Sequence, residues 1–447
     1  MNSQSLFADV AVPVAVHGTF TYAIPEHLRE ALRVGSRVEV PLGTKRTTGF
    51  VVALRDRAET DKLKSINAIL DGEPALLPDI IDLCRWAAEY YLAPLGEMLR
   101  VALPANMSAR AKPGEELRDA RGVHYDRFAV LENDASDVPE KQRAVIDLLK
   151  NGEMLAKDLP SSTLNTLARK GIVRIEKRAR RHELDAFIGG IRATPDLTYS
   201  GEQQHAIDAI KSALGTFAPF LLEGVTGSGK TEVYIEVMRE AVRRGEQGIL
   251  LVPEISLTPV FAARLKERFG DRIAILHSNL SASERYDQWW RARRGEVDVA
   301  IGPRSALFTP FQKLGVIIVD EEGDGAYKQD ETPRYNARDL AVVRAQLRKI
   351  PVILGSATPS LESRENAARG KYGLLRMTQR VEARPLPDAD VIDLRKERAE
   401  KEDRGFVIFS HPLKAAMQET FAAGEQAIVL INRRGYAPYL LCRECGN

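Results

Sequence analysis

The residues with the clearest chemical role are the consecutive eight that read GVTGSGKT. They fit the pattern of a phosphate-binding loop, in which glycines let the backbone bend so that successive N–H groups point at a polyphosphate. Lys230 would reach the β- and γ-phosphates of a nucleotide, and the hydroxyl of Thr231 would hold Mg²⁺. We predict an ATP site formed by Gly224, Val225, Thr226, Gly227, Ser228, Gly229, Lys230 and Thr231.

A second chemical feature is a pair of carboxylates, Asp320 and Glu321, directly after the apolar run Val316–Val319. Nucleotide sites lie at the carboxyl ends of parallel strands, so this pair would meet the loop there. Asp320 would hold Mg²⁺, and Glu321 would orient and deprotonate the attacking water. Upstream, Gln203 and Gln204 offer an amide to the adenine edge, and we assign this role to Gln204.

The segments around the loop favour a strand before it and a helix after it. Phe220–Leu222 is apolar, and Val233–Val242 has helical spacing. A chance match is the alternative for the bare pattern, but this context argues against it. Further apolar runs recur downstream and are continuous rather than alternating, which predicts a doubly wound α/β domain with a buried parallel sheet. The runs are Phe220–Leu222, Ile249–Val252, Ile273–Leu276, Val297–Ile301, Val316–Val319 and Val352–Leu354.

The 447 residues are enough for about three domains, and 44% hydrophobic with 28% charged residues is ordinary for a soluble globular protein. The net charge of +2 means that any nucleic-acid surface must come from local clustering. No run approaches the ~20 apolar residues of a membrane span, so no membrane partner is expected. No signal peptide is recognisable, and three cysteines fit a reducing cytoplasm.

Two smaller modules precede the α/β domain. Short strands separated by glycines predict a mostly β module at the N-terminus, in which Phe20 and Tyr22 either stack on a base or, as is usual, fill the core. Helices at Glu140–Lys150 and Thr163–Lys170, followed by a strand at Ile172–Ile175, are typical of a winged helix. The basic run Arg169–Arg181 is then either a phosphate contact or a solvated face.

Three loops follow strands of the α/β domain: LVPEISLTP (Leu251–Pro259), IGPRSALF (Ile301–Phe308) and GSATPSLES (Gly355–Ser363). Their small, hydroxyl and basic residues suit a groove that follows a nucleic-acid backbone. Taken singly, each is more ordinary as a strand-end loop.

The order of phosphate loop, LVPEISLTP, RSALF, DEE, aromatic loop, GSATPSLE and NRRGYAP resembles the primosomal protein N′ (PriA) family of bacterial replication-restart DNA helicases in superfamily 2. The resemblance implies a multidomain α/β protein. It divides the chain into a 3′-DNA-binding β module (1–105), a winged helix (106–190), a RecA-like helicase lobe 1 (191–380), and a linker with the start of lobe 2 (381–447).

The resemblance also implies a function. It is ATP-driven 3′→5′ unwinding at stalled or repaired forks, followed by primosome assembly. The implied partners are forked and single-stranded DNA, single-stranded-DNA-binding protein and other primosome proteins. An ATP-binding fork-recognition scaffold with little hydrolysis is the alternative, whereas a small-molecule kinase would leave the winged helix and GSATPSLES unexplained.

The resemblance assigns further residues. Ser356 and Thr358 correspond to the coupling motif. DNA contact falls on Arg304, on the aromatic-loop residues Tyr327, Lys328, Arg334 and Tyr335, and on Phe20, Tyr22 and Lys64 in a pocket for a 3′ end.

One departure from the family is Gly323, which stands where the family has the histidine of DEEH. We hypothesise that hydrolysis is therefore less tightly tied to DNA binding, and a restored histidine that left DNA stimulation unchanged would contradict this. Asn336 replaces another family histidine, a milder change because an amide still donates and accepts.

The end of the sequence is the other departure. Ala427–Ile431 reads as the first strand of lobe 2, and we expect a truncated chain because the later helicase motifs, including an arginine finger, do not follow. The family binds two zinc ions, but only Cys442 and Cys445 are present of the four ligands that one structural site needs. We expect zinc in the full-length protein and no stable zinc binding by this chain alone.

Overall fold

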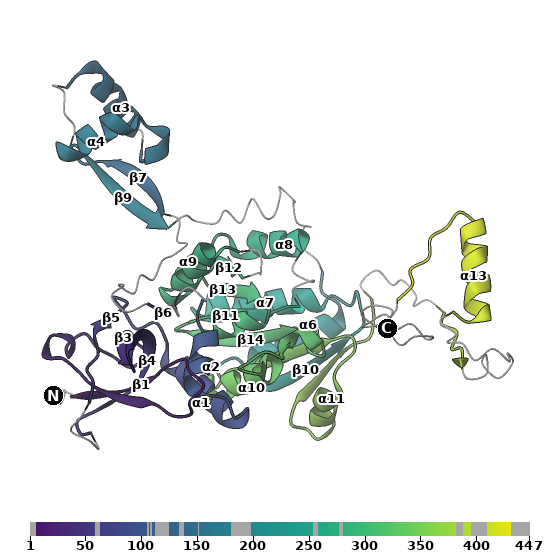
Figure 1. Cartoon of the computed structure of the whole chain (residues 1–447). Helices are drawn as coiled ribbons and strands as arrows, with labels where there is room; N and C mark the ends of the chain where they lie inside the picture. Colours follow the sequence, from purple (N-terminus) through teal and green to yellow (C-terminus); the bar gives the residue numbers. More distant parts are fainter. Residues whose placement is uncertain are drawn as a thin grey trace, which may run out of the picture. The chain divides into compact units, whose positions relative to one another are not determined.

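The computed structural model of the chain separates into two units, residues 1–383 and 384–447 (Figure 1). The residues that it describes are 6–58, 63–104, 107, 110–111, 125–133, 138–150, 152–179, 198–253, 258–276, 280–380, 388–394 and 409–430.

The chain begins with an antiparallel sheet whose strand order is β2-β1-β4-β3-β5, with β6 also on β4. Buried aliphatic side chains such as Val10, Val38 and Val51 form its core, so the predicted β module is confirmed as a fold. The strands are β1 (Phe7–Ala11), β2 (Phe20–Ala23), β3 (Arg37–Leu42), β4 (Lys45–Arg55), β5 (Ala68–Ile69) and β6 (Arg110–Ala111).

A three-stranded antiparallel sheet, β8-β7-β9, follows with two helices. The helices were predicted from the sequence, whereas β7 was missed because it lies next to a polar stretch and pairs with β9, some 45 residues away in sequence. The elements are β7 (Tyr125–Leu131), α3 (Glu140–Lys150), β8 (Met154–Leu155), α4 (Ser161–Arg169) and β9 (Val173–Ala179). That this module is a DNA-binding winged helix stays a prediction.

The largest element is a seven-stranded parallel sheet with the order β12-β13-β11-β14-β17-β10-β18. It confirms the doubly wound domain and all six predicted strands. The seventh, β18, was missed because its exposure alternates, as expected at a sheet edge. The strands are β10 (Pro219–Gly224), β11 (Gln247–Leu251), β12 (Ile273–Ile275), β13 (Val299–Gly302), β14 (Leu314–Asp320), β17 (Val352–Ser356) and β18 (Gly373–Met377).

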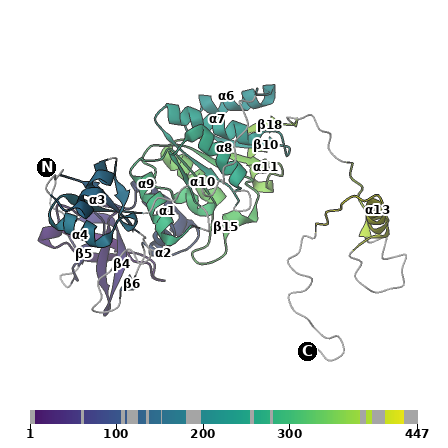
Figure 2. The ribbon, with the colours of Figure 1, turned by 90° about the horizontal axis from the view of Figure 1, so that it is seen from above.

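Helices cover both faces of this sheet (Figures 1 and 2). One face packs on α6 (Gly201–Ser212), α7 (Lys230–Arg243) and α8 (Pro259–Phe269). The other packs on α9 (Ala282–Arg293) and α10 (Ala337–Arg348), joined there by two helices from the N-terminal region, α1 (Pro78–Tyr90) and α2 (Leu95–Val101). The N-terminal helices thus share a core with the parallel-sheet domain.

Shorter elements lie at the carboxyl ends of the strands. A 3₁₀ helix, η5 (Arg304–Phe308), follows β13, and η6 (Gly325–Tyr327) precedes a hairpin of β15 (Lys328–Gln329) and β16 (Tyr335–Asn336). The helix α11 (Leu361–Ala368) follows β17. We refer to residues 325–336 as the aromatic hairpin.

The second unit contains α13 (His411–Ala422), which begins after Ser410. The predicted strand at residues 427–431 is wrong for its described part, because residues 427–430 have no regular secondary structure and Ile428 is 99% exposed. A strand forms only against a hydrogen-bonded neighbour, and no strand in the described ranges pairs with these residues.

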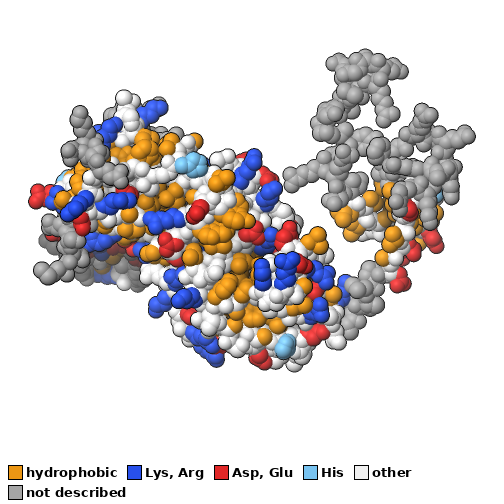
Figure 3. All heavy atoms as spheres, turned by 90° about the horizontal axis from the view of Figure 1, so that it is seen from below, with side chains coloured by type: hydrophobic (Ala, Val, Ile, Leu, Met, Phe, Trp, Pro, Cys, Tyr) orange, Lys and Arg blue, Asp and Glu red, His pale blue; other side chains and the backbone are white. Residues whose placement is uncertain are grey.

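Charge is distributed without a dominant sign, in line with the net charge of +2. On the face drawn in Figure 3, basic and acidic side chains are interspersed among apolar ones. None of the helices in the described ranges is long and apolar enough to cross a membrane.

Candidate functional site

The phosphate loop joins β10 to α7 with a geometry that requires its glycines. Gly229 precedes the helix at φ +83°, in the left-handed region that favours glycine. A Cβ on Gly224 would lie 2.7 Å from Ser228 Oγ, so the close approach of these two residues needs glycine as well. Lys230 is buried, and its Nζ donates to the Gly224 carbonyl at 2.8 Å. The predicted loop residues therefore form one tight turn around the lysine amine.

The loop fits a polyphosphate. Ser228 Oγ is buried and has no hydrogen-bond partner among the described residues, so it is available to a polar ligand. The first turn of α7 presents backbone N–H groups that a helix leaves unpaired, with the positive end of its dipole. Thr231 in that turn and Asp320 supply the oxygen ligands that Mg²⁺ prefers.

Asp320 ends β14, and its Oδ1 accepts a hydrogen bond from the Tyr234 hydroxyl at 2.9 Å. Burial raises the pKa of Asp320, against the opposing effect of this hydrogen bond. Gly355 of the neighbouring strand β17 leaves the space for Tyr234, because a Cβ there would lie 1.8 Å from the hydroxyl oxygen. Tyr234 was missed from the sequence, where it reads as an ordinary helix-face aromatic.

Glu321 begins the turn after the strand and has φ +46°, which is uncommon for a residue with a side chain. Its Oε2 accepts from Ser356 Oγ at 3.0 Å, and the same Oγ accepts from the Thr358 N–H at 3.0 Å. The structure thus brings the predicted catalytic glutamate together with both residues of the predicted coupling motif.

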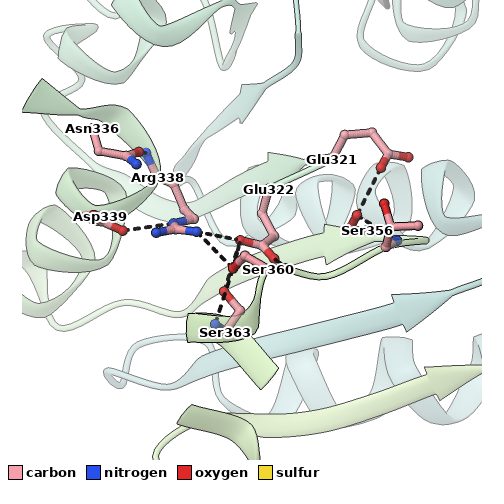
Figure 4. Close-up of polar contacts among 9 residues, drawn as sticks. Glu321, Glu322, Asn336, Arg338, Asp339, Ser356, Ser360 and Ser363 are labelled. Carbon is pink, nitrogen blue, oxygen red and sulfur yellow. Dashed lines mark hydrogen bonds and ion pairs between the residues drawn. The ribbon is translucent and has the colours of Figure 1, made fainter. Parts of the chain in front are cut away.

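Glu322, the next residue, was not singled out from the sequence. It is 1% exposed and accepts hydrogen bonds from the Ser360 N–H at 2.7 Å, Ser360 Oγ at 3.0 Å and Ser363 Oγ at 2.9 Å. Arg338 Nη1 lies 3.2 Å from its Oε2 (Figure 4). The signal that could have found it is a third carboxylate straight after an apolar strand, since a buried charge needs a partner.

Gly323 also lies beside the coupling motif. A Cβ at this position would be 3.2 Å from the Thr358 carbonyl oxygen and 3.6 Å from the Ser360 N–H. A side chain in place of Gly323 would therefore touch the segment that follows β17.

The two glutamines considered for the adenine edge have different surroundings, and the assignment of this role to Gln204 stays a prediction. Gln203 closes the capping box of α6, and its Nε2 donates to the Gly229 carbonyl of the phosphate loop at 3.3 Å. Gln204 is exposed and donates to Asp208 on its own helix. The two side chains diverge because consecutive residues of a helix point about 100° apart.

The predicted DNA contacts divide into exposed and buried side chains. Lys328 and Arg334 of the aromatic hairpin are exposed, and Arg304 Nη1 donates to the Lys328 carbonyl at 3.2 Å. Tyr327 and Tyr335 are buried in this structure, and their assignment to DNA contact stays a prediction. Tyr327 donates to the Asp320 carbonyl at 2.5 Å, and burial raises the pKa of Tyr335 to about 12.

A cavity of about 780 Å³ lies beside these residues and is lined by Arg304, Tyr327 and Tyr335 together with Trp289 and Arg100. Arg100 comes from α2, so the N-terminal region contributes to the wall. Basic and aromatic side chains are the combination that single-stranded nucleic acid contacts in many proteins.

In the β module, only part of the predicted 3′-end pocket is accessible. Tyr22 is 4% exposed and its hydroxyl donates to the Pro41 carbonyl, so this ring belongs to the core and is not free to stack on a base. Phe20 is half-buried, and Lys64 is exposed with its Nζ on the Gly43 carbonyl at 2.8 Å.

The remaining predictions concern metals and loops. Cys442 and Cys445 lie outside the described residues, as do residues 254–257 of LVPEISLTP and residues 432–436. Within the described ranges, no group of three or more His, Cys, Asp or Glu side chains is placed to hold a metal ion.

Two segments of the chain match models of known protein families. A family model described as "3'DNA-binding domain (3'BD)" of PriA matches residues 9–104, and one described as "DEAD/DEAH box helicase" matches residues 200–367. A solved structure of RecG bound to a three-way DNA junction is 21% identical, covers 43% of this chain and 25% of that one, and has a TM-score of 0.31.

Curated relatives match almost the whole chain. Replication restart protein PriA of Bacillus subtilis is 34% identical over 98% of this chain and 64% of that protein. The proteins of the same name from Haemophilus influenzae and Chlamydia muridarum are 38% and 37% identical, and each is covered to 60% of its length. The chain thus spans less than two thirds of the length of these relatives, and over almost its whole length it is similar to replication restart proteins named PriA.

Proposed function

We propose that this chain is the ATP-binding and DNA-recognition part of an ATP-dependent 3′→5′ DNA helicase that recognises stalled or repaired forks and starts primosome assembly. The observation that supports it best is the direct hydrogen bond from Ser356 of the coupling motif to Glu321, beside the phosphate loop. Forked and single-stranded DNA, single-stranded-DNA-binding protein and other primosome proteins are the proposed partners.

The site residues have distinct proposed roles. Lys230 binds the β- and γ-phosphates once it leaves the Gly224 carbonyl, and Ser228 offers its hydroxyl. Asp320 and Thr231 would hold Mg²⁺, which neutralises phosphate charge when bound. Glu321 orients the attacking water and takes its proton. We carry the resemblance-based domain limits 1–105, 106–190, 191–380 and 381–447 as part of this proposal.

The DNA-facing part of the proposal rests on three exposed residues, Lys64, Lys328 and Arg334, and on the half-buried Arg304 and Phe20. Lys328, Arg334 and Arg304 would contact the phosphate backbone, with Phe20 and Lys64 near a 3′ end. Zinc remains a prediction for the full-length protein, in which Cys442 and Cys445 would supply two ligands.

The alternative, a fork-binding scaffold that binds ATP but hydrolyses little, is favoured by Gly323, which leaves the coupling motif without a side-chain neighbour at that position. It differs from the helicase proposal in turnover and not in binding.

The test is ATP hydrolysis by residues 1–447 and by the protein expressed from its complete gene, each with and without a fork that has a 3′ end at the branch. We expect fork-stimulated turnover in the complete protein, and Lys230→Ala should reduce it by about 100-fold or more because it removes a phosphate contact. Fork binding without turnover in both proteins would support the scaffold. A complete protein that neither binds the fork nor hydrolyses ATP would overturn both.

A further inference from the structure

A buried polar cluster lies outside the residues assigned to nucleotide or DNA. It consists of Glu322, Arg338, Ser360 and Ser363, and we call it the Glu322 clasp (Figure 4). Glu322 has no exposed side-chain surface, and the Arg338 side chain is 13% exposed. Every contact made by the carboxylate is with a donor: one backbone N–H, two hydroxyls and a guanidinium.

The clasp joins three segments that are distant in sequence. Glu322 follows the catalytic pair at the end of β14, and its own N–H donates to the Gly355 carbonyl in β17. Ser360 is the N-cap residue of α11 and Ser363 lies in its first turn, directly after the coupling motif. Arg338 lies in the first turn of α10, two residues after the aromatic hairpin.

Stability alone does not account for such a cluster. Burying an ion pair costs desolvation energy that its attraction often fails to repay, so a buried pair is weak reason to expect a more stable fold. What a fully satisfied network does provide is one fixed arrangement of the segments it joins.

The arrangement that it fixes includes the catalytic glutamate. Glu321 and Glu322 are adjacent, and their carboxylates hold opposite ends of the segment 356–360: Glu321 accepts from Ser356, and Glu322 accepts from Ser360. A shift of Ser360 would therefore displace Ser356, and with it the hydrogen bond from Ser356 to Glu321.

The other side of the clasp leads to the proposed DNA contacts. Asn336 ends the aromatic hairpin, and its Oδ1 accepts from the Arg338 N–H at 3.0 Å. Its partner in the hairpin is Lys328, whose carbonyl is held by Arg304. A displacement of the hairpin by DNA would thus act directly on the backbone that carries Arg338.

We propose that Glu322 and Arg338 are positioning residues which transmit the state of the aromatic hairpin to Glu321, so that DNA contact raises the rate of ATP hydrolysis. This inference rests on the proposed function. No nucleotide contact is proposed for either residue.

The test uses the protein expressed from its complete gene and two variants that break the same contact from opposite sides. Glu322→Gln keeps the acceptor for the Ser360 N–H but places an amide donor against Arg338, and Arg338→Met removes the guanidinium at similar length. We expect each to lower the ratio of DNA-stimulated to basal turnover by about tenfold, within the usual range of coupling between sites. The DNA concentration that gives half-maximal stimulation should stay within about threefold, because coupling and not DNA affinity is altered.

The double variant should be no worse than either single one, because both act on one contact. Glu365→Gln is the matched control, since it removes the charge of an exposed ion pair with Arg369 on the same helix α11. Thermal unfolding shows whether each variant is folded. If Arg338→Met does not fold, Arg338→Lys replaces it in the test, because lysine keeps the positive charge but lacks the planar guanidinium that contacts both Glu322 and Ser360. If the losses in the two single variants add up in the double variant, or if the variants keep the wild-type ratio of DNA-stimulated to basal turnover, the inference is wrong but the proposed function still stands. A wild-type protein with no DNA-stimulated turnover would overturn the proposed function and the inference with it.

Discussion

The carboxylate of Asp320 combines a chemical role with a cost to the fold. Burial raises its pKa above the value of an unfolded chain, about 3.9. The native state therefore holds this proton at higher pH than the unfolded state does. Stability from this group is fully present below the unfolded pKa and is lost as pH rises through the raised folded pKa. At neutral pH the ionised carboxylate lowers the free energy of unfolding.

Asp320→Asn should therefore abolish hydrolysis and raise the free energy of unfolding at neutral pH, since the amide still accepts from Tyr234 without a buried charge. Urea unfolding of both proteins at several pH values measures this. The advantage of the variant should shrink as pH falls through the folded pKa, where the wild-type carboxyl becomes neutral. An advantage that is absent at neutral pH, or that grows in acid, would contradict the explanation.

Gly323 offers a second residue-scale prediction. A histidine there would start from a Cβ 3.2 Å from the Thr358 carbonyl, so its ring would lie against the coupling motif after a small backbone adjustment. Gly323→His should raise the ratio of DNA-stimulated to basal turnover by about fivefold, the low end of measured couplings. Gly323→Ala has the same Cβ without the imidazole and is the control. An unchanged ratio, or the same rise in both variants, would show that an imidazole at this position does not couple DNA binding to ATP hydrolysis.

At the scale of elements, sequence patterns correctly predicted the features that depend on residues close together in the sequence. The phosphate loop, the parallel strands and the carboxylates after β14 follow from glycine spacing, continuous apolar runs and a strand end. The patterns failed where distant residues decide. The resemblance assigns Tyr22, Tyr327 and Tyr335 to DNA contact, and their sequence neighbours do not show that packing buries all three. The clasp was missed because nothing in the sequence near Glu322 identifies Arg338 or Ser360 as its partners.

The helix α10 shows how one element serves several sites. Its first turn carries Arg338 of the clasp, and its N-cap residue Asn336 donates its N–H to the Tyr91 hydroxyl at 3.2 Å. Two turns on, Arg344 is fully buried against the N-terminal helix α1. The same rigid helix therefore contacts the aromatic hairpin, the catalytic strand end and the N-terminal region.

At the scale of the whole molecule, the N-terminal region and the helicase lobe behave as one body. The domain limit at residue 105 stays a prediction, and α1 and α2 on its N-terminal side contribute buried side chains to the same core as the parallel sheet. Polar contacts cross as well, from Arg293 to the Pro74 carbonyl at 3.1 Å and from Arg344 to Asp79. An N-terminal region attached in this way can influence the parallel-sheet domain without a flexible linker.

The strongest single link across this junction is Arg344. Its Nε and Nη2 donate to Asp79 Oδ2 at 3.2 and 3.1 Å, Nη2 also donates to the Thr309 carbonyl at 3.0 Å, and Nη1 donates to the Leu307 carbonyl. Arg344→Ala should lower the free energy of unfolding by about 3–5 kcal/mol, because it leaves Asp79 buried without its partner. Urea denaturation of residues 1–383 measures the loss.

Arg348→Ala on the same helix is the matched control, because Arg348 is only half-buried and its one described contact, to the Gln312 carbonyl, should contribute less than about 1 kcal/mol. Replacing both partners, as Asp79→Leu with Arg344→Met, should recover most of the loss, since no unpaired charge then remains. Equal effects of Arg344→Ala and Arg348→Ala would mean that the junction is held by apolar packing alone. A double replacement no more stable than Arg344→Ala would mean that the main stabilising partners of the guanidinium are the carbonyls of Leu307 and Thr309, and not Asp79.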